Sequence, residues 1–191
     1  MSPDPAWRSK PVRRRTASLP LAHLVAAARS GSADALGALY ERYGAGLYRL
    51  AYRLLGNRED AEDVVHDLFV GLPEALRRYE ERGALESWLK RVTARVALMR
   101  LRAGGRRREV HLAVARELVG GDSSAAPPDS RLLQAAVDRL PEHLRSVLVL
   151  KEIEGYSHAE VSELLGISQG ASRIRLMRAV RRLRKSLEDA R

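Results

Sequence analysis

Apolar residues recur every three or four positions over most of the chain, from Leu21 to about Leu101 and again from Arg131 almost to the end. This spacing marks one face of an α-helix, whereas no segment of useful length alternates apolar and polar residues as a strand does. The clearest stripe consists of Leu36, Leu39, Tyr40, Tyr43, Leu47, Leu50, Ala51 and Leu54. The pattern predicts an all-α fold.

Glycine and proline divide the first half of the chain into separate predicted helices. Gly56-Asn57 ends the first stripe, and a second helix is expected over 61–70, opened by Asp60. Gly71 and Pro73 predict that the helical backbone becomes less regular just after this helix. The inward side of the second helix is expected to carry Val64, Val65, Leu68 and Phe69. A third helix, from about Glu86, is expected to bury Trp88, Leu89, Val92, Val96 and Met99.

Composition changes twice along the chain and suggests two helical domains joined by a flexible linker. Residues 1–18 contain three prolines and five basic residues, which predicts a flexible basic tail. Residues 104–130 contain paired glycines, serines and prolines and read as a linker, with a short helix possible over 112–118. The two domains are then expected over 19–103 and 131–191.

The stretch GYSHAEVSELLGISQGASRIRLMRA, residues 155–179, contains two short helical patterns separated by a glycine turn. Ser157 and Glu160 have the spacing of a capping box, in which each caps the other's backbone N–H. Gly166 suits the position that ends a helix, and Ser168 can cap the next one. Two helices joined by so short a turn form a helix-turn-helix, whose second helix enters the DNA major groove.

The second helix of this motif presents different residues on its two faces. Leu176, Ala179, Val180 and Leu183 have the spacing of a side turned toward the domain. The opposite side carries Arg173, Ile174, Met177 and Arg178 within the first three turns. A helix-glycine-helix pattern by itself fits equally an ordinary helical hairpin whose arginines are merely solvated.

Net charge favours the nucleic-acid interpretation. The 34 Lys and Arg residues outnumber the 24 Asp and Glu residues, giving a formal charge of +10, and most of the cations are arginines. Arginine forks bind phosphates and base edges at two points, so an anionic polymer is the expected partner.

The chain has no cysteine, which excludes disulfides and thiolate metal sites. No segment approaches the roughly 18 apolar residues that predict a bilayer span. The sequence Arg13-Arg14-Arg15 followed by LPLAHLVAAA resembles a signal peptide, but Pro20, His23 and Arg29 interrupt the apolar stretch. We therefore expect a cytoplasmic protein with no membrane insertion of its own.

Both halves of the chain resemble one protein family. Residues 132–187, with Leu140-Pro141-Glu142 and the EGYS turn at 154–157, resemble the C-terminal DNA-binding domain of bacterial sigma factors. Residues 21–102, with Ala61-Glu62-Asp63, Phe69 and Trp88-Leu89, resemble the N-terminal domain of the extracytoplasmic-function (ECF) group of these factors. Two motif sets in the right order are more specific than either alone.

The resemblance implies a function. Sigma factors of this group bind core RNA polymerase and direct promoter-specific transcription initiation, and anti-sigma factors commonly hold them inactive. The second domain reads the minus-thirty-five element as duplex, and the first docks on polymerase and captures the melted minus-ten element. The resemblance implies neither an enzyme nor a metal or other cofactor.

The resemblance also assigns candidate residues to each role. The minus-thirty-five set is Ser168, Gln169, Ala171, Arg173, Ile174, Arg175, Met177 and Arg178. The minus-ten set is Arg77, Arg78, Tyr79, Arg82, Ser87, Trp88, Arg91 and Arg95, although Trp88 itself is better explained as a core residue. The polymerase-binding set is Asp60, Glu62, Asp63, His66 and Asp67, whose acids also suit an ordinary solvated helix face near its N-terminus.

Several residues depart from the family pattern, in which the recognition helix begins Gly-Thr-Val-Lys-Ser-Arg. Here that segment is Gly170-Ala171-Ser172-Arg173-Ile174-Arg175. Ala171 lacks a hydroxyl, Ser172 stands where an apolar residue packs, and Ile174 replaces a small polar residue facing DNA. An isoleucine at that position can touch a thymine methyl group.

Three other functions fit parts of the sequence. Asp63-x-x-His66 has metal-ligand spacing on a helix, but a diiron bundle requires a second copy and further carboxylates. A polymerase-independent helix-turn-helix regulator would need a ligand or phosphoacceptor domain, for which no pattern is present. An adaptor that binds only a protein partner remains open because the recognition helix is atypical.

Overall fold

The computed structural model describes residues 19–80, 84–108 and 128–189, and every element in this part of the chain is helical. The first half contains α2 (Leu21–Arg29), α3 (Ala33–Leu55), α4 (Arg58–Arg77) and α5 (Leu85–Arg108). The second half contains α6 (Pro128–Asp138), α7 (Glu142–Leu148), the π-helical turn η1 (Val149–Ile153), α8 (His158–Leu165) and α9 (Gln169–Glu188). The predicted all-α fold is confirmed. The expected tail at 1–18, the possible helix at 112–118 and most of the expected linker lie outside the described residues.

The junction between α3 and α4 forms where the sequence predicted it. Gly56 adopts a left-handed conformation, with φ at 68°, and its N–H donates to the Tyr52 carbonyl. Such a backbone suits glycine, which has no Cβ to clash. The Asn57 side chain then accepts from the N–H groups of Glu59 and Asp60 and starts α4.

Three expectations about the first domain and its C-terminal end are wrong. Helix α4 does not loosen at Gly71 and Pro73 but continues to Arg77. A proline inside a helix removes one backbone hydrogen bond, yet Leu72 and Leu76 on either side are almost fully buried, and their burial favours continuing the helix. Met99 was expected on the buried side of α5, but its side chain is 65% exposed. Helix α5 also runs through Gly104-Gly105, where the linker was expected to begin.

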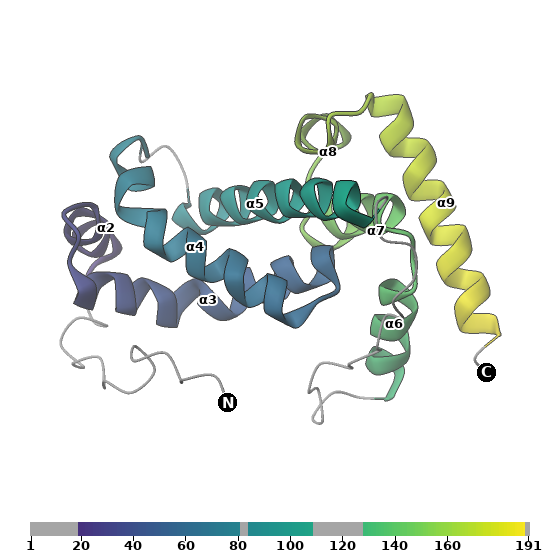
Figure 1. Ribbon diagram of the computed structural model, residues 1–191, viewed down its shortest axis with the longest axis horizontal. Helices are drawn as coiled ribbons and strands as arrows, with labels where there is room; N and C mark the ends of the chain where they lie inside the picture. Colours follow the sequence, from purple (N-terminus) through teal and green to yellow (C-terminus); the bar gives the residue numbers. More distant parts are fainter. Residues whose placement is uncertain (1–18, 81–83, 109–127, 190–191) are drawn as a thin grey trace.

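The first domain is built on α3, α4 and α5, with α2 packed across one end (Figure 1). Its core joins leucines of every helix, including Leu24, Leu39, Leu72 and Leu89, and the inward residues expected on α4 are buried or partly buried. A smaller core in the second domain places Ala179 of α9 against Val137, Leu140, Leu144 and Leu148. The apolar periodicity of the sequence therefore marks the cores correctly on most helices.

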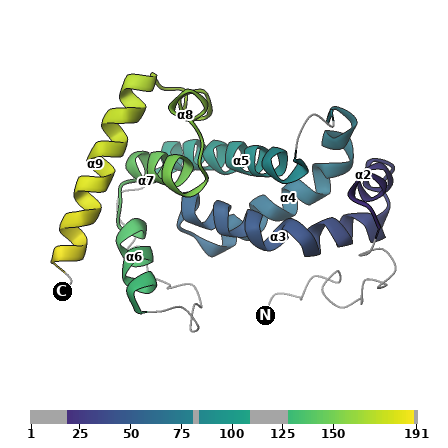
Figure 2. The ribbon, with the colours of Figure 1, turned by 180° about the vertical axis from the view of Figure 1, so that it is seen from behind.

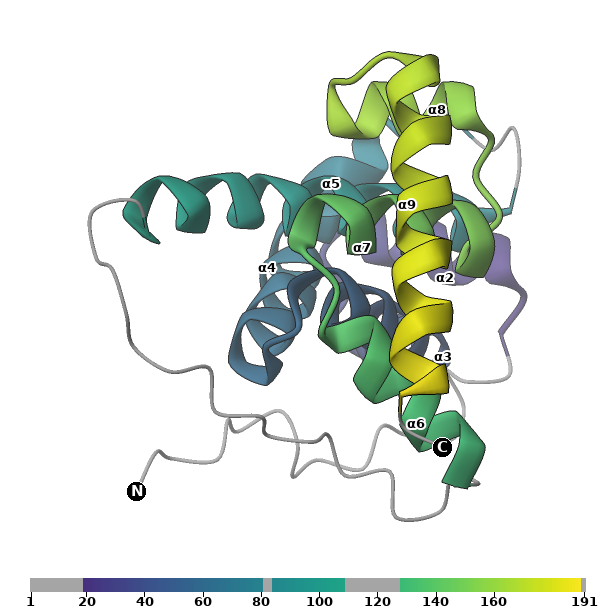
Figure 3. The ribbon, with the colours of Figure 1, turned by 90° about the vertical axis from the view of Figure 1, so that its right-hand side faces the viewer.

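The two domains pack directly against each other through a third apolar cluster. From the first domain it takes Leu50, Leu54, Val64, Ala97 and Leu98, among others. From the second it takes Val147, Val149, Leu150, Val161 and Leu164. Figures 2 and 3 show the consequence: α7 and α8 lie against the α3–α5 layer, whereas α9 lies on the outer side of the second domain. The sequence predicted only a tether between the domains, not this contact.

Candidate nucleic-acid and protein interfaces

The helix-turn-helix forms as the sequence predicted. The Ser157 N–H donates to Glu160 Oε2 at 2.9 Å, and the Glu160 N–H donates to Ser157 Oγ at 3.2 Å, which completes the capping box. Gly166 ends α8 with φ at 66°. Ser168 then caps α9 by accepting from the Ala171 N–H at 3.1 Å. The turn between the two helices is thus fixed by local hydrogen bonds at both ends.

Helix α9 has a buried and an open side, as expected. Ala179 is fully buried, and Leu176, Val180 and Leu183 pack against the core of the second domain. On the open side all but two of the candidate minus-thirty-five residues are exposed, and the two exceptions, Ala171 and Arg175, are half-buried. The exposed members are Ser168, Gln169, Arg173, Ile174, Met177 and Arg178.

Ser172, which stands where the family has an apolar residue, is fully buried and hydrogen-bonded. Its hydroxyl lies 2.9 Å from Nδ1 of His158, the first residue of α8. The buried hydroxyl therefore has a partner, and the bond connects the two helices of the motif. No local pattern in the sequence indicates this role for His158, because the two residues lie on different helices.

The candidate minus-ten residues come from two helix ends. Arg77 and Arg78 are exposed at the end of α4, where Arg77 pairs with Glu74 at 3.2 Å. On α5 one exposed face carries Ser87, Arg91 and Arg95, spaced four residues apart. Arg82 lies outside the described residues.

Tyr79 and Trp88 are mostly enclosed. Tyr79 is 8% exposed and its ring centroid lies 5.0 Å from that of Trp88. Trp88 is half-buried and packs against the core of the first domain, which agrees with a structural role for it. The carbonyl of Tyr79 also accepts from Arg29 on α2. The two rings therefore pack on each other and on the core of the first domain rather than projecting into solvent.

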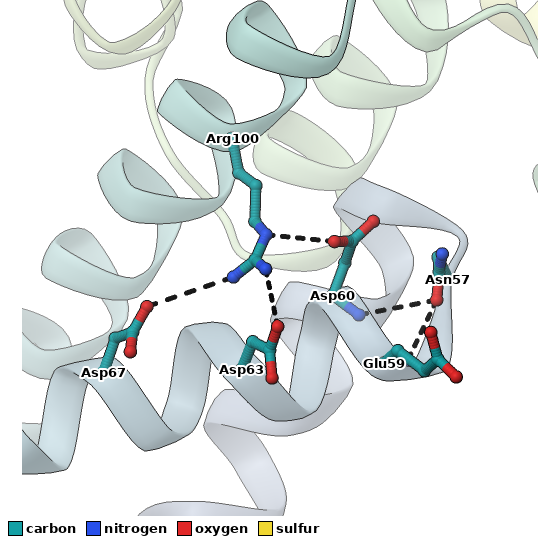
Figure 4. A network of polar contacts seen from close by, with 6 residues as sticks. All are labelled: Asn57, Glu59, Asp60, Asp63, Asp67 and Arg100. Atoms are coloured by element: carbon teal, nitrogen blue, oxygen red, sulfur yellow. Dashed lines mark hydrogen bonds and ion pairs between the residues drawn. The ribbon is translucent and has the colours of Figure 1, made fainter.

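The candidate polymerase-binding carboxylates share one partner that the sequence analysis missed. Arg100 of α5 reaches over α4, with its Nε 2.9 Å from Asp60 and its two terminal nitrogens directed at Asp63 and Asp67 (Figure 4). Glu62 pairs instead with Arg58, and His66 is exposed. The acidic side chains are thus gathered on one accessible face. No signal within the α4 segment could have identified Arg100, which lies 37 residues beyond Asp63.

Polar contacts as well as apolar ones cross between the domains. Arg145 of α7 is fully buried and donates from Nε to the Leu54 carbonyl and from a terminal nitrogen to the Leu55 carbonyl, both at 3.3 Å. These are among the last carbonyls of α3, where a cation is electrostatically favourable. Arg102 donates to the Leu164 carbonyl at the end of α8 in the same manner.

Two carboxylates of the second domain meet cations of the first. Glu154 has only 6% of its side chain exposed and lies 3.2 Å from Lys90 and 3.8 Å from Arg53. Glu160 lies 2.6 Å from Arg91. The pKa of Glu160 is lowered chiefly by the backbone N–H of Ser157, then by the Ser157 hydroxyl, with Arg91 contributing less. The Glu160 carboxylate therefore serves both the helix cap and the contact between domains.

The described residues include no group of three His, Asp or Glu side chains arranged to hold a metal ion, and the Asp63-x-x-His66 pair is therefore without further ligands there. In the same part of the chain, none of the helices combines the length and apolar character required to cross a membrane.

Comparison with known proteins identifies both domains. Residues 39–107 match sigma-70 region 2, and residues 130–183 match sigma-70 region 4. The RNA polymerase sigma factor CarQ of Myxococcus xanthus is 33% identical over 84% of this chain and 94% of its own length. The ECF RNA polymerase sigma factor SigM of Mycobacterium tuberculosis is 31% identical over 87% of this chain and 84% of its own.

The chain belongs to the ECF RNA polymerase sigma factors. The resemblance read from the sequence is thereby confirmed. SigE of Mycolicibacterium smegmatis, also an ECF sigma factor, is 38% identical over 74% of this chain, and the match spans 57% of the length of SigE. Region 2 accordingly takes in most of α3 with α4 and nearly all of α5, and region 4 takes in most of α6, α7, η1, α8 and most of α9.

Solved structures support the assignment of the fold. CnrH, solved in complex with the cytosolic domain of CnrY, is 28% identical to this sigma factor over 88% of the chain, with a TM-score of 0.52. The sigma factor RpoE of Bartonella quintana, solved with the anti-sigma factor NepR, has a TM-score of 0.61 at 21% identity over 76% of the chain. The second likeness concerns the fold alone.

Proposed function

We propose that this sigma factor directs core RNA polymerase to promoters by reading a duplex upstream element with α9. The observation that carries the proposal is the open face of α9, where Arg173 and Arg178 are exposed on a helix whose other side is buried. The N-terminal turns of such a helix meet base edges in the major groove. Arginines there can contact guanine at two points or bind phosphates.

The remaining minus-thirty-five candidates take supporting roles in the proposal. Ser168 and Gln169 lie at the N-terminus of α9, where N–H groups and the helix dipole favour a phosphate. Ala171 has no polar side chain, and its N–H already donates to the capping Ser168 hydroxyl, so its role is to leave room for the DNA backbone. Arg175 is half-buried and reaches the edge of the same face.

The melted minus-ten element is proposed to bind where the end of α4 meets the start of α5. Arg77, Arg78, Arg91 and Arg95 supply the positive charge that a single strand requires, and Ser87 lies on the same face as Arg91. Tyr79 and Trp88 support this surface from below, and Arg82 completes the proposed set.

The acidic face of α4 is proposed to dock on a basic surface of core RNA polymerase. Asp60, Glu62, Asp63 and Asp67 concentrate negative charge in a protein whose formal net charge is +10, and His66 lies among them. Complementary charge speeds association and sets orientation. Arg100 holds three of the carboxylates in place while leaving them accessible.

Co-elution of the full chain with core RNA polymerase tests this docking. Asp67→Arg changes a carboxylate whose side chain is 66% exposed and whose distance to Arg100 is 3.9 Å, the longest of the three. Asp34→Arg, at an exposed position in the first turn of α3, provides the same charge reversal away from α4. We expect Asp67→Arg to lose co-elution and Asp34→Arg to keep it. Equal retention by both folded variants would contradict docking through α4.

Run-off transcription tests the assignment of α9. A promoter is first selected from genomic fragments with the reconstituted holoenzyme. Arg173→Ala and Arg178→Ala should lower initiation at that promoter and retain polymerase binding, whereas Arg139→Ala, at an exposed position before α7, should change neither. Initiation at the wild-type rate by both α9 variants would show that the helix assignment is wrong.

Other aspects of the proposal concern regulation and location. An anti-sigma protein is proposed to control this factor, since the similar protein CnrH was solved with a bound protein domain. Capture of a protein that blocks run-off transcription by wild-type holoenzyme would support this.

The factor is proposed to act in the cytoplasm, with its polymerase and DNA, and to have no catalytic activity of its own. A polymerase-independent regulator, the alternative, would bind its operator tightly without polymerase and fail to co-elute with it.

A further inference from the structure

Two large apolar side chains project from the open face of α9. Ile174 is 48% exposed and Met177 is 65% exposed. The two are three residues apart on one helix and therefore lie side by side on its surface. Leu176, Val180 and Leu183 already supply the contacts with the second domain, so Ile174 and Met177 are not needed for that packing.

The surroundings of this apolar pair are cationic. Arg173 and Arg178 are exposed on either side of it. Met177 also borders a groove along α9, whose charged lining residues are Arg173, Arg181, Arg184 and Lys185, with Glu188 and Asp189 at the C-terminal end of the helix. Strong positive charge around an apolar pair is complementary to nucleic acid, whose phosphates flank the base edges.

The position along the helix agrees with contact to bases. Ser168 caps α9, so Ile174 lies in the second helical turn and Met177 in the third. In a helix-turn-helix the early turns of the second helix approach the base edges. In the major groove, thymine alone among the four bases presents a methyl group, whereas the other features there are hydrogen-bond donors and acceptors. Of these features, an isoleucine side chain can make a favourable contact only with the methyl group, because it has no hydrogen-bond donor or acceptor.

We propose that Ile174, together with Met177, recognises thymine methyl groups in the upstream promoter element. The inference rests on the proposed function, since it requires α9 to lie in the major groove, and it adds the chemistry of the base that is read. It also gives a role to the departure from the family pattern at Ile174: a small polar residue there would leave a thymine methyl without an apolar partner.

Replacement of thymine by deoxyuridine tests the proposal, because it removes only the methyl group. The selected upstream duplex is substituted one thymine at a time, and binding of the full chain is measured at one fixed salt concentration. We expect at least one substitution to weaken wild-type binding by about threefold to fivefold, the effect of one buried methyl group. Ile174→Ser or Met177→Gln should bind the unmodified duplex more weakly and discriminate less between thymine and deoxyuridine.

Ile153→Ser provides the matched control, because Ile153 is 42% exposed and lies on η1 rather than on α9. It should keep the wild-type preference for thymine. Equal binding of every deoxyuridine duplex by the wild-type protein would overturn the proposal, as would full discrimination in both folded α9 variants. Arg173→Ala separates this failure from that of the proposed function. If Arg173→Ala still weakens binding, only the thymine inference fails, whereas no effect of Arg173→Ala would refute the α9 interface as a whole.

Discussion

The guanidinium of Arg91 lies 2.6 Å from the carboxylate of Glu160, so a candidate minus-ten residue is paired with the capping residue of the helix-turn-helix. The two side chains are 48% and 38% exposed. A pair this accessible contributes roughly 0.2–1 kcal/mol. If a single strand binds Arg91 as proposed, it must compete with Glu160 for that side chain in this arrangement of the domains.

Removing the charge of Glu160 should therefore strengthen the binding of single-stranded DNA to the first domain. Glu160→Gln retains a side chain that can complete a capping box. We expect it to tighten binding of a minus-ten oligonucleotide by roughly twofold to fivefold, the range of a surface ion pair, whereas Arg91→Gln should weaken it. Fluorescence anisotropy with the full chain measures both effects. Glu163→Gln makes the same charge change at an exposed position on α8, and an equal gain in that variant would refute a specific role for the pair.

Arg145 is expected to be the residue of the domain contact whose loss costs most. Its fully buried guanidinium donates to the carbonyls of Leu54, Leu55 and Asp138. Arg145→Met fills similar space but leaves these acceptors without that donor, so the free energy of unfolding should fall by about 3 kcal/mol or more. Urea unfolding measures this loss, and Arg139→Met at an exposed position should stay within about 0.5 kcal/mol of wild type. An unchanged midpoint and slope for Arg145→Met would contradict this assignment.

Features defined by a few neighbouring residues were predictable from the sequence. The capping box of Ser157 and Glu160, the glycine at 166 and the cap at Ser168 all formed as expected. Each depends on backbone groups within a few positions, so its signal is present in the local sequence. The open and buried sides of α9 followed from its apolar spacing for the same reason.

Features that depend on distant partners were not predictable in this way. Arg145 lies 91 residues beyond Leu54, whose carbonyl it binds, and no local pattern distinguishes it from a solvated arginine. Arg100 is likewise paired across helices with carboxylates of α4. Pro73 does not end α4, because the burial of Leu72 and Leu76 outweighs one lost hydrogen bond. In each case the deciding contact is tertiary.

The bond between Ser172 and His158 should appear as an energetic coupling between α8 and α9. Ser172→Val restores an apolar residue but leaves Nδ1 of His158 without the hydroxyl that lies 2.9 Å away. We expect Ser172→Val and His158→Leu each to destabilise the protein and the double variant to lose less than their sum, with a coupling of about 1 kcal/mol. Urea unfolding of the four proteins measures it. Additive effects, within about 0.3 kcal/mol, would show that the bond contributes nothing to stability.

The contact between Lys90 and Glu154 predicts a pH dependence of stability at high pH. Burial of the Lys90 ammonium lowers its pKa, but the Glu154 carboxylate at 3.2 Å and the Glu86 carboxylate outweigh this effect, so the pKa is raised above 10.5. A group whose pKa is higher in the folded state binds its proton more tightly there. It therefore stabilises the fold fully below the unfolded pKa and loses that contribution as pH rises through the folded pKa.

The difference in unfolding free energy between wild type and Lys90→Met should accordingly be constant from about pH 7 to 9 and shrink above the ordinary pKa of lysine. Urea unfolding of both proteins at intervals up to about pH 11.5 measures it. Lys185→Met, at an exposed position on α9, should show little difference from wild type at any of these pH values. A Lys90 difference that persists unchanged at the highest pH would mean that the lysine stabilises the domain contact by packing its aliphatic stem. If instead the difference between wild type and Lys90→Met disappears as Lys90 loses its charge, the stability that Lys90 contributes comes from its ion pair with Glu154.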